Sequence, residues 1–287
     1  MKINTFTMAL AGLFLASCSS QVMKNSLNYP ETKKVEHTDE YFGTKVADPY
    51  RWLEDDRAED TKDWVQREVA FTQNYLSQIP FREEIRAQLK NIWNYEKISA
   101  PFKEGDYTYF YKNDGLQAQS VLYRTDKNGN TEVFLDPNKF SEKGTTSMSN
   151  KKKKKKGTLA AYNISEGGSD WQKIVIINAI TKEKIDETIT DVKFSGASWL
   201  GDEGFFYSSY GKVQGSELSV KTDMHKVYFH KLGTKQSEDK HIIGDENFKR
   251  RYMNIGVSDD ERFLILNASI ATNGNELYVK DLKNNTD

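Results

Sequence analysis

The spacing of apolar residues changes near residue 100, from a helical period to an extended one. Across residues 49–93, apolar side chains recur every three to four positions, which is typical of amphipathic helices. In the first predicted helix Trp64, Phe71 and Tyr75 share one face. Pro80 ends this helix, because proline has no amide hydrogen to donate.

The second predicted helix has a more regular apolar stripe. Its apolar members are Phe81, Ile85, Leu89 and Ile92, and charged residues occupy the opposite face. A stripe with this spacing favours packing against another part of the protein over a ligand-binding function. We therefore expect the stripe to lie against another domain.

From Asp106 onward the apolar period is two, which predicts β-strands. Apolar strand cores recur about every 45 to 60 residues, near the period of propeller blades with four strands each. They are Tyr109–Tyr111, Leu159–Tyr162, Phe205–Tyr207 and Phe263–Leu266. A second extended segment after each core would complete a hairpin, and Asn128-Gly129 marks one turn because both residues tolerate positive φ. The pattern predicts an antiparallel β-propeller with about four blades.

The first 18 residues have the pattern of an export signal. Lys2 is followed by an apolar stretch over residues 6–16 and then by small residues, the order found in secretory signals. Leu15-Ala16-Ser17-Cys18 resembles a bacterial lipobox, in which the cysteine becomes the lipidated first residue of the mature protein. We expect an exported, periplasmic protein with a linker over residues 19–30 and a membrane tether through Cys18. An ordinary cleaved signal peptide is the alternative.

Composition narrows the classes of partner and cofactor. The chain has 287 residues, of which 37% are hydrophobic, and a formal charge of −1. These values favour a globular fold and argue against a general nucleic-acid binder. Cys18 is the single cysteine, so the chain has no internal disulfide. Its sequence contains no glycine-rich phosphate loop, and we expect neither a cofactor nor a metal site.

The run Lys151 to Lys156 departs from the alternating pattern. Three interpretations are open: a solvated flexible loop, a sequence irregularity of the kind that a slipped adenine tract produces, and a segment that binds a polyanion. The near-neutral charge and the lack of aromatic residues among the lysines disfavour a nucleic-acid partner.

Candidate catalytic residues are few. The run Gly167 to Trp171 (GGSDW) approaches a nucleophile elbow, but tryptophan replaces the final glycine and extended residues follow where a helix is required. Ser169 therefore fits a hairpin turn better than a nucleophile. His225 and His230 lie five residues apart on a predicted strand, so their side chains point to opposite faces, which disfavours a shared metal. We predict no catalytic residue in this chain.

Four runs resemble the prolyl oligopeptidase family, in that family's order. They are Val46 to Asp55 (VADPYRWLED), Ser165 to Trp171 (SEGGSDW), Val192 to Trp199 (VKFSGASW) and His225 to Asp239 (HKVYFHKLGTKQSED). The resemblance covers nearly everything from Tyr29 onward. It implies a helical segment over residues 31–100 and a propeller over residues 101–287.

Members of that family have seven blades and a C-terminal α/β-hydrolase domain that carries the nucleophile, acid and base. The expected fold is therefore mainly β, with an incomplete propeller after a short helical segment and without the hydrolase domain. Whole family members cleave short peptides after proline through an acyl-serine intermediate. We expect short proline-containing peptides and a hydrolase domain, in cis or in trans, as partners, and no activity from the chain itself.

The resemblance also implies two substrate-contacting residues. A phenylalanine of the VKFS run forms part of the family's peptide-binding wall, which implies this role for Phe194, and Met253 matches a second wall residue. Without the resemblance, Phe194 would be interpreted as a blade-core aromatic. The alternative function is a non-catalytic propeller binding module or a lipoprotein scaffold.

Overall fold

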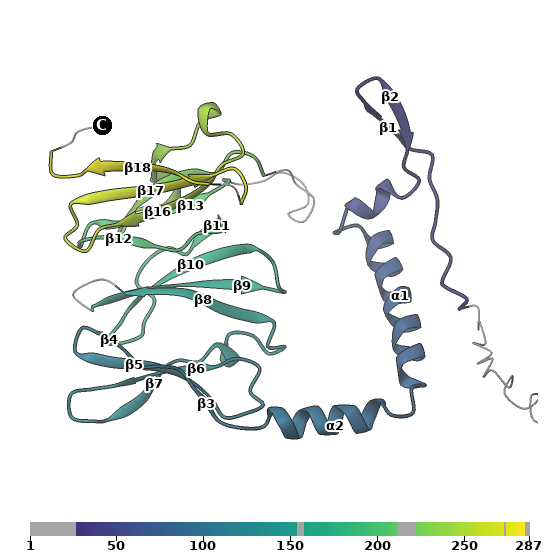
Figure 1. Ribbon diagram of the computed structural model, residues 1–287, viewed down its shortest axis with the longest axis horizontal. Coiled ribbons are helices and arrows are strands. Elements are labelled where there is room, and N and C mark those ends of the chain that lie inside the picture. Colours follow the sequence, from purple (N-terminus) through teal and green to yellow (C-terminus); the bar gives the residue numbers. More distant parts are fainter. Residues whose placement is uncertain (1–26, 154–157, 212–221, 273, 285–287) are drawn as a thin grey trace, which may run out of the picture.

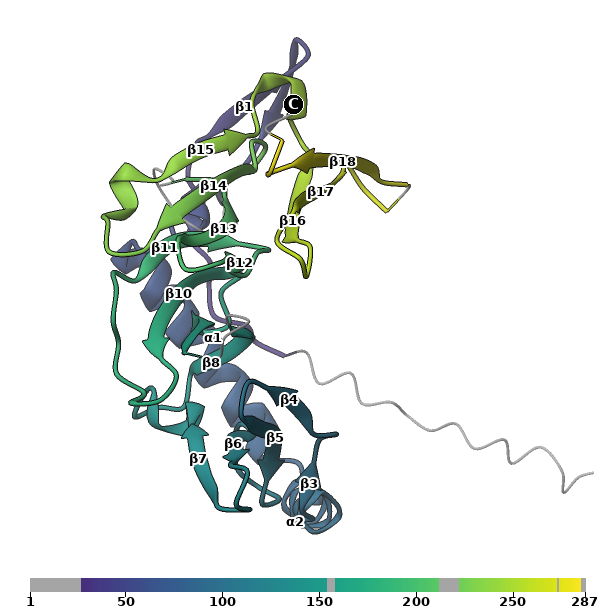
Figure 2. The same ribbon diagram turned by 90° about the vertical axis from the view of Figure 1, so that its left-hand side faces the viewer.

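The computed structural model shows antiparallel blades stacked face to face after a helical N-terminal segment (Figure 1). The structure describes residues 27–153, 158–211, 222–272 and 274–284. Figure 2 shows the blades fanned along a curve rather than piled in a flat stack. Within these residues, no helix is both long and apolar enough to span a membrane.

Four blades follow one another along the chain, which confirms the prediction of a mainly β, partial propeller. Blade 1 contains β3 (Lys97–Ile98), β4 (Phe102–Glu104), β5 (Tyr107–Asn113), β6 (Val121–Thr125) and β7 (Thr131–Leu135). Blade 2 contains β8 (Thr146–Lys153), β9 (Leu159–Glu166), β10 (Trp171–Asn178) and β11 (Ile189–Lys193). Blade 3 contains β12 (Ser198–Leu200), β13 (Gly204–Ser209), β14 (Lys226–Lys231) and β15 (Lys240–Ile243). Blade 4 contains β16 (Tyr252–Val257), β17 (Phe263–Ser269) and β18 (Glu276–Asp281).

Strands pair as antiparallel neighbours within each blade, and in blade 1 both β3 and β4 pair with β5. The four predicted strand cores all lie in strands, namely β5, β9, β13 and β17. A single residue pair, Val192 with Ser209, joins blade 2 to blade 3, so these two blades form one eight-stranded sheet. Asn128-Gly129 lies in the turn from β6 to β7 as predicted, with Gly129 at a φ of 87°.

Three apolar cores hold the blades together, one at each junction between neighbours. Because side chains alternate across a strand, β10 sends Ile177 into the core shared with blade 1 and Ile176 into the core shared with blade 3. Phe205 and Phe206 of β13 divide in the same way between the blade 2 and blade 4 junctions. Each fully buried side chain of this size stabilises the fold by about 1.5 to 3 kcal/mol.

The N-terminal segment contains both predicted helices. Its elements are the hairpin β1 (Thr38–Tyr41) and β2 (Thr44–Ala47), η1 (Arg51–Glu54), α1 (Glu59–Ser77) and α2 (Arg82–Trp93). The chain before β1 runs along α1, where Trp64 Nε1 donates to Thr32 Oγ1 at 2.9 Å and the Phe71 ring lies 4.9 Å from Tyr29. The hairpin was not predicted from the sequence. Short 3₁₀ turns in the blade region are η2 (Pro137–Lys139), η3 (Gln236–Glu238) and η4 (Glu246–Phe248).

The apolar stripe of α2 is exposed, not buried. Phe81, Ile85, Leu89 and Ile92 are each about half exposed, and no residue of α2 is buried among the described residues. In Figure 1 α1 stands apart from the blades and α2 leads from it into β3. The expected packing of this stripe against another domain therefore stays a prediction.

Part of the lysine run belongs to a strand. Lys151 to Lys153 end β8, which pairs with β9 despite a register shift between Ser149 and Lys152. The loop interpretation is therefore wrong for these three residues, because their backbone continues the blade. Lys154 to Lys156 lie outside the described residues, as does the predicted signal with Cys18. The proposed boundaries at residues 30 and 100 stay predictions.

Candidate functional site

Phe194 and Tyr252 form an exposed aromatic pair beside the junction of blades 3 and 4. Their rings meet edge to face with centroids 5.7 Å apart, and each residue is about half exposed. Two open hollows adjoin them, one of about 780 Å³ between the β12 and β16 segments and one of about 690 Å³ beside Tyr252. Phe194 and Asn254 line both hollows, so an extended ligand in either one would meet Phe194.

The Phe194 turn is held in a strained conformation. Phe194 has a φ of 53°, a left-handed geometry that costs a residue other than glycine roughly 1 kcal/mol or more. Asn163 Nδ2 donates to the Ser195 carbonyl at 2.7 Å, and the Ser208 amide donates to Ser195 Oγ at 2.8 Å. These two bonds tie the turn to blades 2 and 3 and offset the strain.

Met253 lies at the base of the same region. It is 1% exposed and belongs to the core between blades 3 and 4, yet it also lines the smaller hollow. Ser208 Oγ donates to its carbonyl at 2.9 Å. The structure thus brings Phe194 and Met253 to one hollow, and their contact with substrate stays a prediction.

One cation lies among the aromatic residues of this region. Lys193 Nζ is 5.2 Å from the Phe194 ring centroid and 5.1 Å from that of Trp171, distances at which a cation and an aromatic face attract each other. Asp170 lies 4.0 Å from the same nitrogen. The region combines aromatic faces with the Lys193 ammonium group, and the carboxylates of Glu104, Asp259 and Glu261 line the larger hollow. Apolar faces with a few polar groups are typical of ligand sites.

Ser169 occupies the β9–β10 hairpin turn, as the turn interpretation expects. Gly167 and Gly168 have positive φ, and the Ser169 amide donates to the Glu166 carbonyl at 3.2 Å. Ser169 Oγ accepts a hydrogen bond from the Trp171 amide at 3.1 Å. This hydroxyl stabilises the turn, and within the described part of the chain its hydrogen-bond partner is this amide rather than a histidine. Among the described residues, no group of three potential metal ligands is present.

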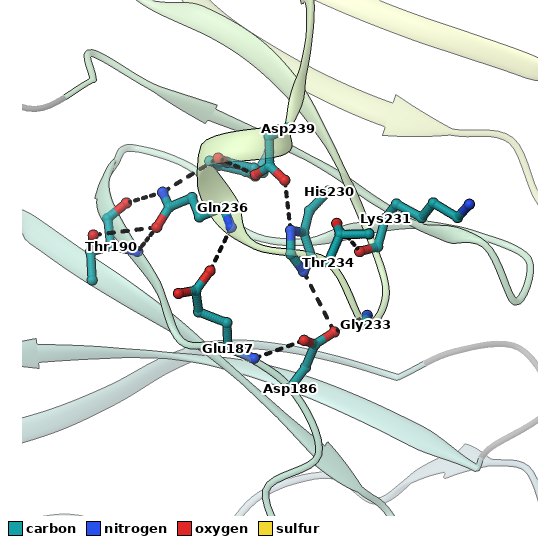
Figure 3. Close-up of polar contacts among 10 residues, drawn as sticks. Asp186, Glu187, Thr190, His230, Lys231, Gly233, Thr234, Gln236 and Asp239 are labelled. Atoms are coloured by element: carbon teal, nitrogen blue, oxygen red, sulfur yellow. Dashed lines mark hydrogen bonds and ion pairs between the residues drawn. The ribbon is translucent and has the colours of Figure 1, made fainter.

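His230 is enclosed by carboxylates, an arrangement that sequence reasoning did not anticipate (Figure 3). Its Nδ1 lies 2.7 Å from Asp239 Oδ1, and Asp186 Oδ2 is 3.5 Å from Nε2, close enough for an ion pair. The Gly233 amide donates to Asp186, and the Tyr207 hydroxyl donates to Asp239. Burial alone would lower the pKa of His230, but the two carboxylates together raise it above its usual value.

Several polar residues of the HKLGTKQSED run make structural contacts in or beside this cluster. The Gln236 side chain accepts a hydrogen bond from the Thr190 amide and donates one to the Thr190 carbonyl. The backbone amide of Gln236 donates to the Glu187 carboxylate. With His230 and Asp239, these contacts fasten the segment after β14 to the segment that leads into β11 (Figure 3). Polar residues in the run therefore join blade 3 to blade 2.

Comparison with known proteins gives a consistent result over the whole chain. Residues 30–287 match the family model described as prolyl oligopeptidase, N-terminal beta-propeller domain. Prolyl endopeptidases of Elizabethkingia miricola and Elizabethkingia meningoseptica are each 69% identical over 288 residues. These alignments cover 100% of this chain and 41% of each relative, so the chain spans less than half of the relatives' length.

A solved structure gives the same fold. Prolyl oligopeptidase B from Galerina marginata, bound to a 25mer macrocyclization substrate, aligns with a TM-score of 0.74 at 28% identity. That alignment covers 89% of this chain and 39% of the other. The matched region includes both the helical segment and the blades around Phe194. The chain therefore belongs to the prolyl oligopeptidase family and corresponds to its N-terminal β-propeller part.

Proposed function

We propose that this chain is the N-terminal part of a serine prolyl oligopeptidase that cleaves short peptides after proline. The observation that carries the proposal is the 69% identity to prolyl endopeptidases along the full length of the chain. The chemistry would come from a hydrolase domain, in the same polypeptide or in a separate one. The chain by itself would be inactive, because its buried histidines are engaged by backbone groups and carboxylates rather than by a serine hydroxyl.

In this proposal the propeller part limits access and contacts the peptide. Phe194 and Met253 would form a wall for residues that precede the scissile bond, with the Phe194 face exposed for that contact. Support comes from the hollow that both residues line and from the half-exposed side chain of Phe194. An apolar wall discriminates peptides by burial of their side chains.

The exposed stripe of α2 would pack against the hydrolase domain. The four stripe residues recur at helical spacing and belong to none of the three cores between the described blades, whereas the opposite face is charged. Burial of this stripe would contribute hydrophobic free energy only when the domain is present. This gives the helical segment a role in assembly rather than in blade stability.

We also propose export to the periplasm with a lipid anchor on Cys18. The apolar stretch and the LASC run support this, and stable anchoring requires more than one acyl chain. Mass spectrometry of the mature protein tests it. A lipidated N-terminal cysteine is expected, and a different, unmodified N-terminus would leave export without the tether.

A chimaera tests the peptidase proposal. This chain replaces the matching 41% of the Elizabethkingia meningoseptica prolyl endopeptidase, and cleavage of a blocked peptide after proline is followed. The chimaera should cleave, and Phe194→Ala should raise KM about tenfold with little change in kcat, the signature of lost binding. A folded chimaera without activity would favour a non-catalytic binding module.

The coding DNA provides an independent test. Sequencing across Lys151 to Lys156 and beyond the codon for Asp287 should reveal a continuing frame with a Gly-x-Ser-x-Gly run and a later histidine. A separate nearby frame with those residues would favour assembly in trans. If the DNA contains neither a continuing frame nor a nearby separate frame with those residues, the peptidase proposal is contradicted.

A further inference from the structure

His225 lies directly beneath the Phe194 and Met253 region, in the position before β14. It is 1% exposed and is among the most deeply buried polar residues of the described chain. A buried imidazole without partners would destabilise the fold. Its partners therefore identify what the side chain does.

Both ring nitrogens bind backbone groups of other strands. The Met253 amide donates to Nδ1 at 3.0 Å, and Nε2 lies 2.9 Å from the Lys193 carbonyl oxygen. An amide N–H can only donate and a carbonyl can only accept, so Nδ1 carries no proton and Nε2 carries one. The ring is neutral, and the pKa of His225 is lowered to about 4 because burial disfavours the charged form.

These two bonds hold the backbone of Met253 and of Lys193, the neighbour of Phe194. Lys193 directly precedes Phe194 and ends the outer strand of blade 2, whereas Met253 lies in the first strand of blade 4. His225 of blade 3 therefore joins the residue before Phe194 to the Met253 backbone, and Ser208 makes a second link through Ser195 Oγ and the Met253 carbonyl. No other described side chain bonds the backbone of both Lys193 and Met253.

The surroundings of His225 restrict its movement. The Tyr210 ring stacks on it with centroids 4.5 Å apart and planes 20° from parallel. On the backbone side, Gly244 approaches so closely that a Cβ there would lie 2.6 Å from the His225 carbonyl oxygen. Packing therefore holds the ring in the orientation that its two hydrogen bonds require.

We propose that His225 is a positioning residue for the peptide-binding wall, which it aligns by holding the Lys193 carbonyl and the Met253 amide. This inference rests on the proposed function. Because His225 is buried, it acts through Phe194 and Met253 rather than on the substrate. Its loss should weaken peptide binding and leave the chemical step unchanged.

Three variants of His225 in the chimaera separate its two bonds. His225→Phe keeps the ring shape and removes both bonds. His225→Asn keeps an acceptor near the Nδ1 position for the Met253 amide, and His225→Gln keeps a donor near the Nε2 position for the Lys193 carbonyl. KM and kcat are measured for a short blocked peptide with proline before a chromogenic amine, and thermal unfolding is recorded for every variant.

His225→Phe should raise KM about fivefold with kcat unchanged, and the Asn and Gln variants about twofold, since small displacements of binding groups weaken binding. The buried His230 is the matched control. His230→Gln should lower the unfolding temperature without raising KM. In a Phe194→Ala background, His225→Phe should add less than about twofold, because residues that act through one another are not additive.

The outcomes distinguish this inference from the proposed function. If Phe194→Ala leaves KM unchanged, the wall itself is wrong. If Phe194→Ala raises KM but the His225 variants do not, or if they lower kcat as much as they raise KM, the positioning role is wrong. Should His225→Phe fail to fold, the Asn and Gln variants decide by the same criterion, each with one bond retained.

Discussion

Apolar residues are buried in the blades but exposed in the helical segment. In the blades, apolar residues on both faces of β10 and β13 are buried in cores with the neighbouring blades. In α2 and at its N-cap, four apolar residues at regular helical spacing remain about half exposed. The difference shows that blades 1 to 4 stabilise one another, whereas the helical segment presents a surface that these blades do not cover.

The largest contrast should appear when one apolar side chain is truncated in each region. Phe205→Ala should lower the free energy of unfolding by about 4 kcal/mol, because Phe205 is 0% exposed between blades 2 and 3 and leaves a cavity. The matched change Leu89→Ala in α2 should cost less than about 0.5 kcal/mol. Urea unfolding of the chain measures both, and equal losses would contradict the comparison.

Loss of a polar contact between blades should lower the free energy of unfolding almost as much as loss of an apolar one. His230→Phe leaves the buried carboxylates of Asp186 and Asp239 without their cation and should cost about 3 to 4 kcal/mol. His241→Phe is the control, since His241 is exposed on β15, and it should change stability by less than about 0.5 kcal/mol. If both variants unfold alike, the cluster is not a blade contact.

The two buried histidines should respond to pH with opposite signs. The pKa of His225 is lowered to about 4, so the unfolded chain binds its proton first as pH falls below about 6.5. Stability from His225 is complete above that pH and falls by about 3 kcal/mol as pH approaches 4. The raised pKa of His230 gives stability that is present below about 6.5 and lost as pH rises through the raised value.

Urea unfolding across pH 4 to 9 measures both contributions. His225→Gln should reduce the loss of unfolding free energy below about pH 6.5. His230→Gln should reduce the loss of unfolding free energy as pH rises above about 6.5. A profile that keeps its acid slope in the His225 variant would show that other groups cause it.

The smallest effect on the chain alone should come from the stripe. Replacement of Ile85 and Leu89 by Gln should change the unfolding free energy of the chain by less than about 0.5 kcal/mol, because both are exposed. In the chimaera, the same pair should lower the unfolding temperature by several degrees, because the proposed contact with the hydrolase domain is lost. Equal effects in both proteins would remove the assembly role of α2.

Local pattern was sufficient to predict the blades and the helices. The period of two placed the cores of β5, β9, β13 and β17, and the helical spacing placed α1 and α2. The β1–β2 hairpin was missed because its strands are four residues each and expose most of their side chains, which leaves little alternation to detect. Its Phe42-Gly43 turn, with positive φ at both residues, was the signal available.

The polar contacts around the site could not be predicted from local pattern. His225 binds backbone groups of Lys193 and Met253, which are 32 and 28 residues away. Backbone partners leave no residue type to search for in the sequence. Asp186 reaches His230 only because blades 2 and 3 join through β11 and β13.

The most direct test of the central claim compares proline-specific cleavage by the purified chain with cleavage by the chimaera under the same conditions. We predict no cleavage by the chain and cleavage by the chimaera, because the blades supply the peptide wall and the added domain supplies the nucleophile and base. Proline-specific cleavage by the chain alone, abolished by Ser169→Ala, would contradict the account, as would a folded chimaera that does not cleave.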